Sequence, residues 1–360
     1  MKKAFTLIEV VAAIAILAMV LSFSGVIFKA GIEAYRVAGA NAEIMQKFRA
    51  ITDQLNADFK GLRKDAPLLI SFSQDNTYDP NRFDQIMFFA NGDFQSTQLY
   101  DYGKSPVVPS VPPITGQEHP IIGNLARLFY GQAKSRDPYD NQMKDPDEIY
   151  QQRQRILARR QHILTADSAL ARWPDVNNVA FSFSAPAENE WYEHDRLSLS
   201  QWKTVDVSAY NNIVSSCFGY RPLINLQNMT GLHMLMCQGL ASFTIQWAYW
   251  DPGDKVLRWY PSNDPYGNNT YSHFALPLGY EFGVYFNVPN GNQFSVWYPI
   301  GNNNIKFDEL GNSFPADFYP KALKFTFRLC DSKGIVKEYD VKNKIKRPGR
   351  TFTHIVYLDN

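Results

Sequence analysis

The first thirty residues constrain the fold of this chain more than any other part of the sequence. A short basic start over residues 1–4 is followed by Phe5-Thr6-Leu7-Ile8-Glu9 and then by an uncharged apolar run over residues 10–28. A helix needs roughly 20 apolar residues to cross about 30 Å of hydrocarbon. The small residues near the end of this run lead into more helical sequence, whereas an ordinary secretory signal would end there in a cleavage site. We therefore predict a retained transmembrane helix over residues 5–28.

Glu9 is the unusual residue of this segment, because it places a carboxylate at the edge of a membrane helix. An unpaired charge in such a position costs several kcal/mol and usually marks a functional residue. We therefore expect Glu9 to have a partner.

The same start resembles the precursors of the type IV pilin and type II secretion pseudopilin superfamily, which share a basic leader, a small residue, Phe-Thr-Leu-Ile-Glu and an apolar helix. The resemblance covers residues 2–21. It implies that a prepilin peptidase cuts between Ala4 and Phe5, that the new amine of Phe5 is N-methylated, and that Glu9 becomes the fifth residue of the mature chain. The amine of one subunit would neutralise Glu9 of its neighbour and set the register of a filament. The family usually has glycine before the cut, so Ala4 predicts slower processing.

Beyond Lys29 the sequence becomes amphipathic, with apolar residues at alternating spacings of three and four. These residues are Tyr35, Ala38, Ala42, Met45, Phe48, Leu55, Phe59 and Leu62. The pattern predicts that residues 29–66 continue the first helix to about Leu62, where Ala66 and Pro67 end it. A coiled-coil seam is the weaker alternative, because the stripe spans few heptads and lacks ordered flanking charges.

Residues 67–360 alternate short apolar runs with Asn, Asp, Gly and Pro, a pattern typical of antiparallel strands. We therefore predict an α+β, pilin-like fold in which a long N-terminal helix packs on antiparallel sheet. The clearest strands are predicted at residues 85–90, 179–183, 242–250, 256–260, 323–329, 336–341 and 352–358. Residues 331–334 are predicted to form a hairpin turn.

Three stretches of the β-rich part have the composition of insertions. Residues 102–120 are predicted to form an extended surface loop, residues 137–170 carry a polar helical pattern over 151–164, and residues 263–304 show weak strand signals. Such insertions are where a member of a structural family acquires its own partners.

The closing strands resemble, more loosely, those of the J-type minor pseudopilin and its W-type pilus counterpart. The resemblance rests on residues 246–250, 320–325, 331–334 and 351–358. It implies a subunit at the tip of a short periplasmic filament, beside I-type and K-type subunits and the major pseudopilin, assembled on an inner-membrane platform. An adhesive, DNA-uptake or substrate-recognition minor pilin is the alternative function.

The composition gives little support to an enzyme or a polyanion-binding protein. With 36 basic and 35 acidic residues, the formal charge is +1, so we expect no nucleic-acid partner. No nucleophile, nucleotide or metalloprotease motif is found. Carboxylates at Glu188, Glu190, Glu193 and Asp195 are more typical of a solvated loop than of a glycosidase pair.

Neither cofactors nor metals are expected from the motifs. Acidic residues at Asp137, Asp140, Asp145, Asp147 and Glu148 offer oxygen ligands that Ca²⁺ accepts, but their spacing is not that of a calcium loop. A charged surface is the favoured interpretation. Tryptophans at Trp247, Trp250 and Trp259 are interpreted as core or interface residues in preference to a sugar-binding face.

The three cysteines leave two alternatives open. In an oxidising compartment Cys217 and Cys237 would form a disulfide and leave Cys330 free. Alternatively, all three are buried thiols.

Overall fold

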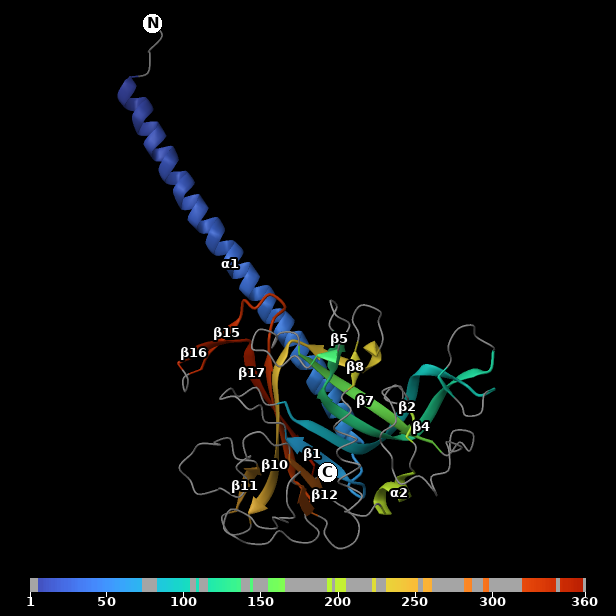
Figure 1. The fold of residues 1–360 in the computed structure, drawn as a ribbon. Coiled ribbons are helices and arrows are strands. Elements are labelled where there is room, and N and C mark those ends of the chain that lie inside the picture. Colours follow the sequence, from blue (N-terminus) through green and yellow to red (C-terminus); the bar gives the residue numbers. More distant parts are fainter. Residues whose placement is uncertain are drawn as a thin grey trace.

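A computed structural model of the protein describes residues 6–72, 83–103, 108–109, 116–136, 143–144, 155–165, 193–195, 198–204, 222–224, 231–251, 255–260, 282–286, 294–297, 319–340 and 344–358. One helix dominates it: α1 (Leu7–Lys60) has 54 residues and a length of about 80 Å. Its first half projects away from the β-rich domain and its second half packs into that domain (Figure 1). The predicted continuous helix and the α+β fold are confirmed.

The helix ends slightly earlier than predicted, and the reason is a close approach to a strand. Asn91 on β2 (Gln85–Asp101) donates its N–H to the carbonyl of Gly61 over 2.7 Å. A Cβ at position 61 would lie 1.9 Å from the Asn91 carbonyl oxygen, so a side chain does not fit there. The chain then pairs with β2, since Arg63 N–H donates to the Phe89 carbonyl over 2.8 Å. Strand pairing therefore ends the helix before Ala66 and Pro67 are reached.

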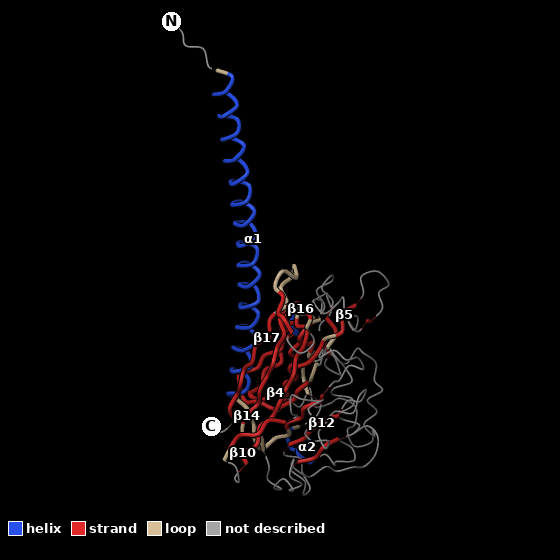
Figure 2. Tube along the Cα trace, turned by 90° about the vertical axis from the view of Figure 1, so that its left-hand side faces the viewer, coloured by secondary structure: helices blue, strands red, loops and turns tan. Residues whose placement is uncertain are grey.

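Two antiparallel sheets pack against one side of the second half of α1 (Figure 2). The larger has the order β13 (Phe294–Trp297), β12 (Phe282–Phe286), β1 (Leu68–Phe72), β2, β4 (Glu118–Gln132), β7 (Ile156–Leu164) and β9 (Leu235–Gln238), with β3 (Val108–Pro109) paired to β2. The smaller has the order β11 (Val256–Tyr260), β10 (Leu240–Asp251), β14 (Ala322–Leu329) and β17 (Arg350–Tyr357).

Shorter elements lie around these sheets. They are β5 (Lys134–Arg136), β6 (Met143–Lys144), β8 (Leu223–Ile224), the pair β15 (Lys337–Asp340) and β16 (Ile345–Pro348), the helix α2 (Leu199–Thr204) and the 3-10 turn η3 (Leu232–Met234).

The core lies between the helix and both sheets. Phe59 stacks on Phe88 of β2, with ring centroids 4.2 Å apart, and also contacts Phe325 of β14 at 5.6 Å. Phe48 stacks on Phe352 of β17 at 4.7 Å. The packed half of α1 thus contributes side chains to the core beside both sheets.

The predicted apolar stripe was right near the end of the helix and wrong at its start. Leu55 and Phe59 are buried, but Tyr35 and Met45 are exposed, and the buried positions are instead Ala40, Ile44 and Ile51. The face that packs is therefore rotated relative to the predicted one. The domain covers only the helix beyond about residue 40, so Tyr35 and Ala38 of the predicted stripe lie before the segment that packs.

Six predicted strands are confirmed: β11 has the predicted bounds, and β2, β10, β14, β15 and β17 have shifted ends. The seventh, residues 179–183, lies outside the described residues. Four of the strands that build the larger sheet, β1, β4, β7 and β9, were not predicted as strands.

The helical pattern over residues 151–164 was wrong, because Ile156–Leu164 forms strand β7. This strand lies between β4 and β9 and is buried on both faces. Its polar residues are accommodated by partners, as Arg160 shows, whose guanidinium lies 5.0 Å from the ring centroid of Phe129. A strand with buried polar residues on both faces does not show the two-residue alternation by which strands are recognised.

The predicted loop over residues 102–120 was wrong in part, because it contains β3 and the start of β4. Within residues 263–304, β12 and β13 are strands and the remainder lies outside the described residues.

The predicted hairpin at residues 331–334 was also wrong. The strands on either side do not pair with each other: β14 pairs with β10 and β17, and β15 pairs with β16.

Candidate functional site

The first half of α1 is a bare apolar surface. Leu7 is 84% exposed, Ile14 61% and Phe28 72%. Within the described residues, α1 is the one helix whose length and composition suffice to cross a membrane. Isolated apolar side chains on a protein surface need no explanation, but a continuous apolar patch of this size marks a surface that contacts lipid or other proteins. The helix fits a membrane anchor.

Glu9 lies in the first turn of α1 and has a local partner. Its carboxylate oxygen Oε2 accepts hydrogen bonds from the backbone N–H and the hydroxyl of Thr6, both over 2.9 Å. A carboxylate is also favoured here by the partial positive charge of the helix N-terminus. This contact with Thr6 was not predicted from the sequence, although a Thr followed three residues later by Glu is the pattern of a capping box. Ala4 and Phe5 lie outside the described residues, so the cleavage position stays a prediction.

Asp58, in the last turn of α1, is the centre of a buried polar cluster that fixes the helix to the larger sheet. It is 5% exposed and accepts hydrogen bonds from Arg159 Nε over 2.7 Å, Arg159 Nη2 over 2.8 Å and Gln54 Nε2 over 3.0 Å. The hydroxyl of Tyr130 donates a further short hydrogen bond to it. Tyr130 belongs to β4 and Arg159 to β7, so the cluster joins one helix to two strands.

The protonation states in this cluster are set by burial and by the Asp58 charge. Burial and the negative charge of Asp58 both raise the pKa of Tyr130, which therefore stays a neutral donor. Burial alone would lower the pKa of Arg159, but the hydrogen bonds and charge of Asp58 raise it. The guanidinium thus remains charged and paired.

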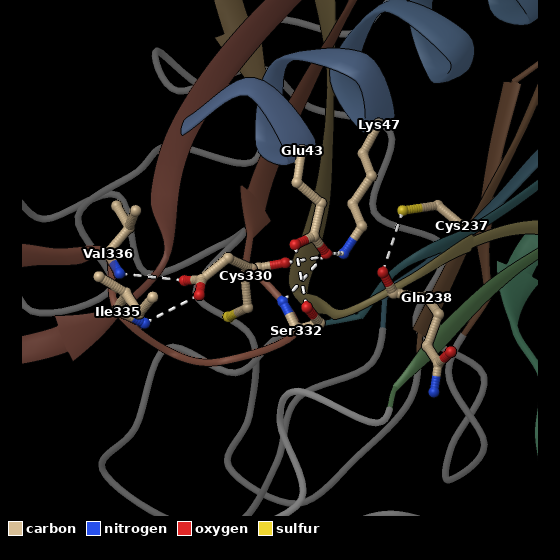
Figure 3. A network of polar contacts seen from close by, with 9 residues as sticks. Glu43, Lys47, Cys237, Gln238, Cys330, Ser332, Ile335 and Val336 are labelled. Atoms are coloured by element: carbon tan, nitrogen blue, oxygen red, sulfur yellow. Dashed lines mark hydrogen bonds and ion pairs between the residues drawn. The ribbon is translucent and has the colours of Figure 1, made fainter. Parts of the chain in front are cut away.

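A second cluster fixes the start of the packed half of α1 to the smaller sheet (Figure 3). Lys47 Nζ lies 2.8 Å from Glu43 Oε1 and donates to the carbonyl of Cys330 over 2.9 Å. Glu43 in turn accepts hydrogen bonds from the N–H and hydroxyl of Ser332, each over 3.0 Å. Burial alone would raise the pKa of Glu43, but these bonds to Lys47 and Ser332 lower it.

The turn that contains Ser332 is also stabilised by hydrogen bonds between its own residues. The carboxylate of Asp331 accepts the N–H groups of Ile335 over 2.8 Å and Val336 over 3.0 Å. Residues 331–336 are therefore a capped turn docked on α1. With clusters at both ends, the packed half of the helix has a defined orientation in the domain.

The carboxylates that were interpreted as a solvated loop are buried where the structure describes them. Glu193 Oε2 accepts the N–H groups of Thr97 over 2.7 Å and Gln98 over 2.9 Å. Asp195 lies 2.5 Å from Arg127 Nε and accepts Trp202 Nε1 over 3.1 Å. These contacts hold the segment onto β2 and β4. The interpretation as a solvated loop was therefore wrong for Glu193 and Asp195, while Glu188 and Glu190 lie outside the described residues.

The tryptophans differ in their surroundings. Trp247 is buried in the core, as expected, whereas Trp250 is exposed and Trp259 is half-buried beneath Lys324, whose Nζ lies 4.5 Å from the ring centroid.

The described residues contain no group of three or more His, Cys, Asp or Glu side chains that could hold a metal ion. The acidic residues over 137–148 lie outside that part of the chain. Cys237 is buried, and burial raises the pKa of its thiol to about 11. Because Cys217 lies outside the described residues, its disulfide with Cys237 stays a prediction.

Comparison with known proteins identifies the start of the chain. Residues 1–25 match the family model described as the prokaryotic N-terminal methylation motif. Searches of curated proteins and of solved structures gave no match. The motif implies processing by a prepilin peptidase and assembly with other pilins. Together with the apolar helix that follows it, the motif makes the start of this chain similar to that of the prepilins of the type IV pilin and pseudopilin superfamily.

Proposed function

We propose that this chain is a minor pseudopilin, a structural subunit of a type II secretion pseudopilus that supports protein secretion. In this proposal it is inserted in a bacterial inner membrane with the β-rich domain in the periplasm, cut between Ala4 and Phe5, methylated on Phe5, and assembled at the filament tip. The observation that carries the proposal is the bare apolar half of α1 directly behind a methylation motif.

The physical step is the exchange of lipid for neighbouring helices around α1. Lipid tails are as apolar as leucine, so burial of apolar surface alone gives little drive for this exchange. A carboxylate at membrane depth, by contrast, costs about 2.5–3.5 kcal/mol unless it is paired. Pairing of Glu9 with the amine of Phe5 on a neighbour therefore supplies both a driving force and an axial register. The contacts from Thr6 hold the carboxylate at the helix start until that amine arrives.

The two polar clusters, around Asp58 and around Glu43, connect the domain mechanically to α1. A force applied along the helix passes to the larger sheet through Asp58 and to the smaller sheet through Glu43 and Lys47. The domain would therefore move with its helix as one body when the subunit leaves the membrane.

The finer assignment to the J-type, beside I-type and K-type subunits, rests on the resemblance of the closing strands, and the comparisons add no support to it. A substrate-recognising or adhesive minor pilin is the second candidate. One observation favours it: the far ends of β2 and β4 project beyond the helix and expose Leu99 and Ile122 (Figure 1).

The test compares Glu9→Val with Glu9→Gln in cells that assemble the filament. Both variants should be inserted and processed normally, and both should enter filaments poorly, because neither side chain carries the charge that pairs with the amine. Normal incorporation of Glu9→Val would contradict the proposal. Deletion of residues 102–116 distinguishes the two candidates: loss of surface binding with intact secretion would favour the minor pilin.

A further inference from the structure

Strand β17 has one edge in the smaller sheet and one edge that no strand covers in the described part of the chain. Leu358 N–H donates to the Lys321 carbonyl over 2.9 Å, on the side of β14. Because the groups of an antiparallel strand alternate in direction, Phe352, His354 and Val356 face β14 with Leu358. The odd-numbered residues of β17 therefore direct their N–H and C=O groups to the open edge.

The first part of this open edge is already occupied. Gly349 N–H donates to the Val336 carbonyl over 2.9 Å, and Thr351 donates its N–H and hydroxyl to Glu338 Oε2 over 3.0 and 2.7 Å. These partners lie in β15 and the residue before it, so this segment covers the beginning of β17.

The second part of the edge is uncovered. Thr353, Ile355 and Tyr357 have no backbone partner on this side among the described residues, and Ile355 is 38% and Tyr357 66% exposed. We call these three positions the β17 edge. Soluble proteins protect exposed strand edges with charges, proline or a covering element. In the part of the chain that the structure describes, the β17 edge has none of these, and its threonine, isoleucine and tyrosine are strong strand formers.

The direction of β17 limits what can pair there. Phe352 stacks on Phe48, and further along the strand His354 Nε2 lies 2.9 Å from Asn56 Oδ1. Strand and helix therefore advance in the same general direction, and β17 lies alongside the packed half of α1 (Figure 2). A two-fold pairing of two β17 strands would point the two helices in opposite directions. Two chains anchored in one membrane cannot pair in that way.

We propose that the β17 edge is a docking strand, to which an extended segment of a different pilin-type subunit adds as the next strand of the smaller sheet. The inference rests on the proposed assembly function, because the shared membrane orientation is what excludes a symmetric pair. Main-chain hydrogen bonds would supply the affinity, and the exposed Ile355 and Tyr357 side chains the selectivity. The site lies on the same side of the domain as the helix, so a neighbour packed on α1 is already close to it.

The test uses the full-length protein in its native membrane. The photoreactive residue p-benzoyl-phenylalanine replaces Tyr357 in the edge, Tyr339 in the exposed part of β15, or Ile14 in the apolar half of α1. Crosslinked peptides are identified by mass spectrometry. We expect the probe at position 357 to crosslink to a strand of another chain that carries an N-terminal methylation motif. The crosslinking yield at position 357 should be at least about tenfold above that at position 339, because only position 357 lies in the proposed contact.

Two matched variants separate the edge from general damage. Ile355→Lys places a charge in the edge and should lower the crosslink at position 357 about tenfold, since a charge buried in an interface without a partner is costly. Val256→Lys places the same charge on β11, at the opposite edge of the same sheet, and should leave the yield unchanged. Ile355→Pro removes the outward N–H without removing a hydrogen bond to β14, and it should act like Ile355→Lys.

Equal yields at positions 357 and 339, an unchanged yield in Ile355→Lys, or crosslinks only between two β17 strands would each overturn the proposal. Crosslinks at position 14 without any at position 357 would overturn the docking strand and leave the assembly function standing. Absence of both would overturn the two together.

Discussion

Arg159 on β7 forms a two-pronged ion pair with Asp58 in the last turn of α1, although the two residues are 101 positions apart in the sequence. The pair, completed by Tyr130, is the contact by which the helix and the larger sheet fix each other's position. Because this pair joins the end of α1 to β7, the direction in which the helix leaves the domain is set by the folded domain.

Removing Arg159 should therefore destabilise the domain. Loss of one partner leaves a buried carboxylate uncompensated, so we expect Arg159→Ala to lower the free energy of unfolding by about 3 kcal/mol. Urea denaturation of the full-length protein in detergent measures this. Arg63→Ala, which removes the exposed pair with Asp65, is the control and should cost under about 1 kcal/mol. Equal losses in the two variants would contradict the role assigned to the cluster.

The Glu43 cluster should make stability depend on acidity. The pKa of Glu43 is lowered in the folded state, so its contribution is complete above the ordinary value of 4.5 and is lost as the pH falls through the folded-state value. Glu43→Gln should flatten the fall in stability below pH 4.5. Melting temperatures between neutral and acid pH measure the effect. If the melting temperature of Glu43→Gln fell with acid pH as steeply as that of the unchanged protein, other groups would be responsible for the pH dependence.

Gly61 should not tolerate a side chain. A Cβ there would meet the Asn91 carbonyl, so Gly61→Ala should cost about 1–3 kcal/mol through displacement of the helix end from β2. Gly39→Ala is the matched control, because nothing lies within 4 Å of its Cβ, and it should raise helix stability by up to about 1 kcal/mol. Thermal denaturation compares the two, and a neutral Gly61→Ala would refute the close approach.

Cys237 should resist alkylation in the folded protein. Its burial, and a thiol pKa raised to about 11, leave little reactive thiolate at neutral pH. Iodoacetamide labelling should occur only after unfolding. Labelling of the unfolded protein without a reductant indicates a free thiol, whereas a requirement for reductant indicates the predicted bond to Cys217. Rapid labelling of the native protein would contradict the buried position.

Local patterns predicted the long helix and all four strands of the smaller sheet, because those strands alternate cleanly, as Leu323, Phe325 and Phe327 do. They failed for β7, where Arg160 and His162 are buried beside apolar residues, and for the pairing of β14, which depends on residues far away in sequence. The polar residues of the candidate site were likewise predicted only where the signal is local in sequence. Glu9 was found from its charge, whereas Asp58 and Glu43 were missed because their partners come from distant strands.

Removal of the leader and methylation of the new chain end are the steps on which the proposed function depends. Intact-mass and peptide mass spectrometry of the protein isolated from its native membrane tests this directly. We expect a chain that begins with N-methylated Phe5 and lacks residues 1–4. A functional protein that retains Met1 and an unmodified leader would contradict it.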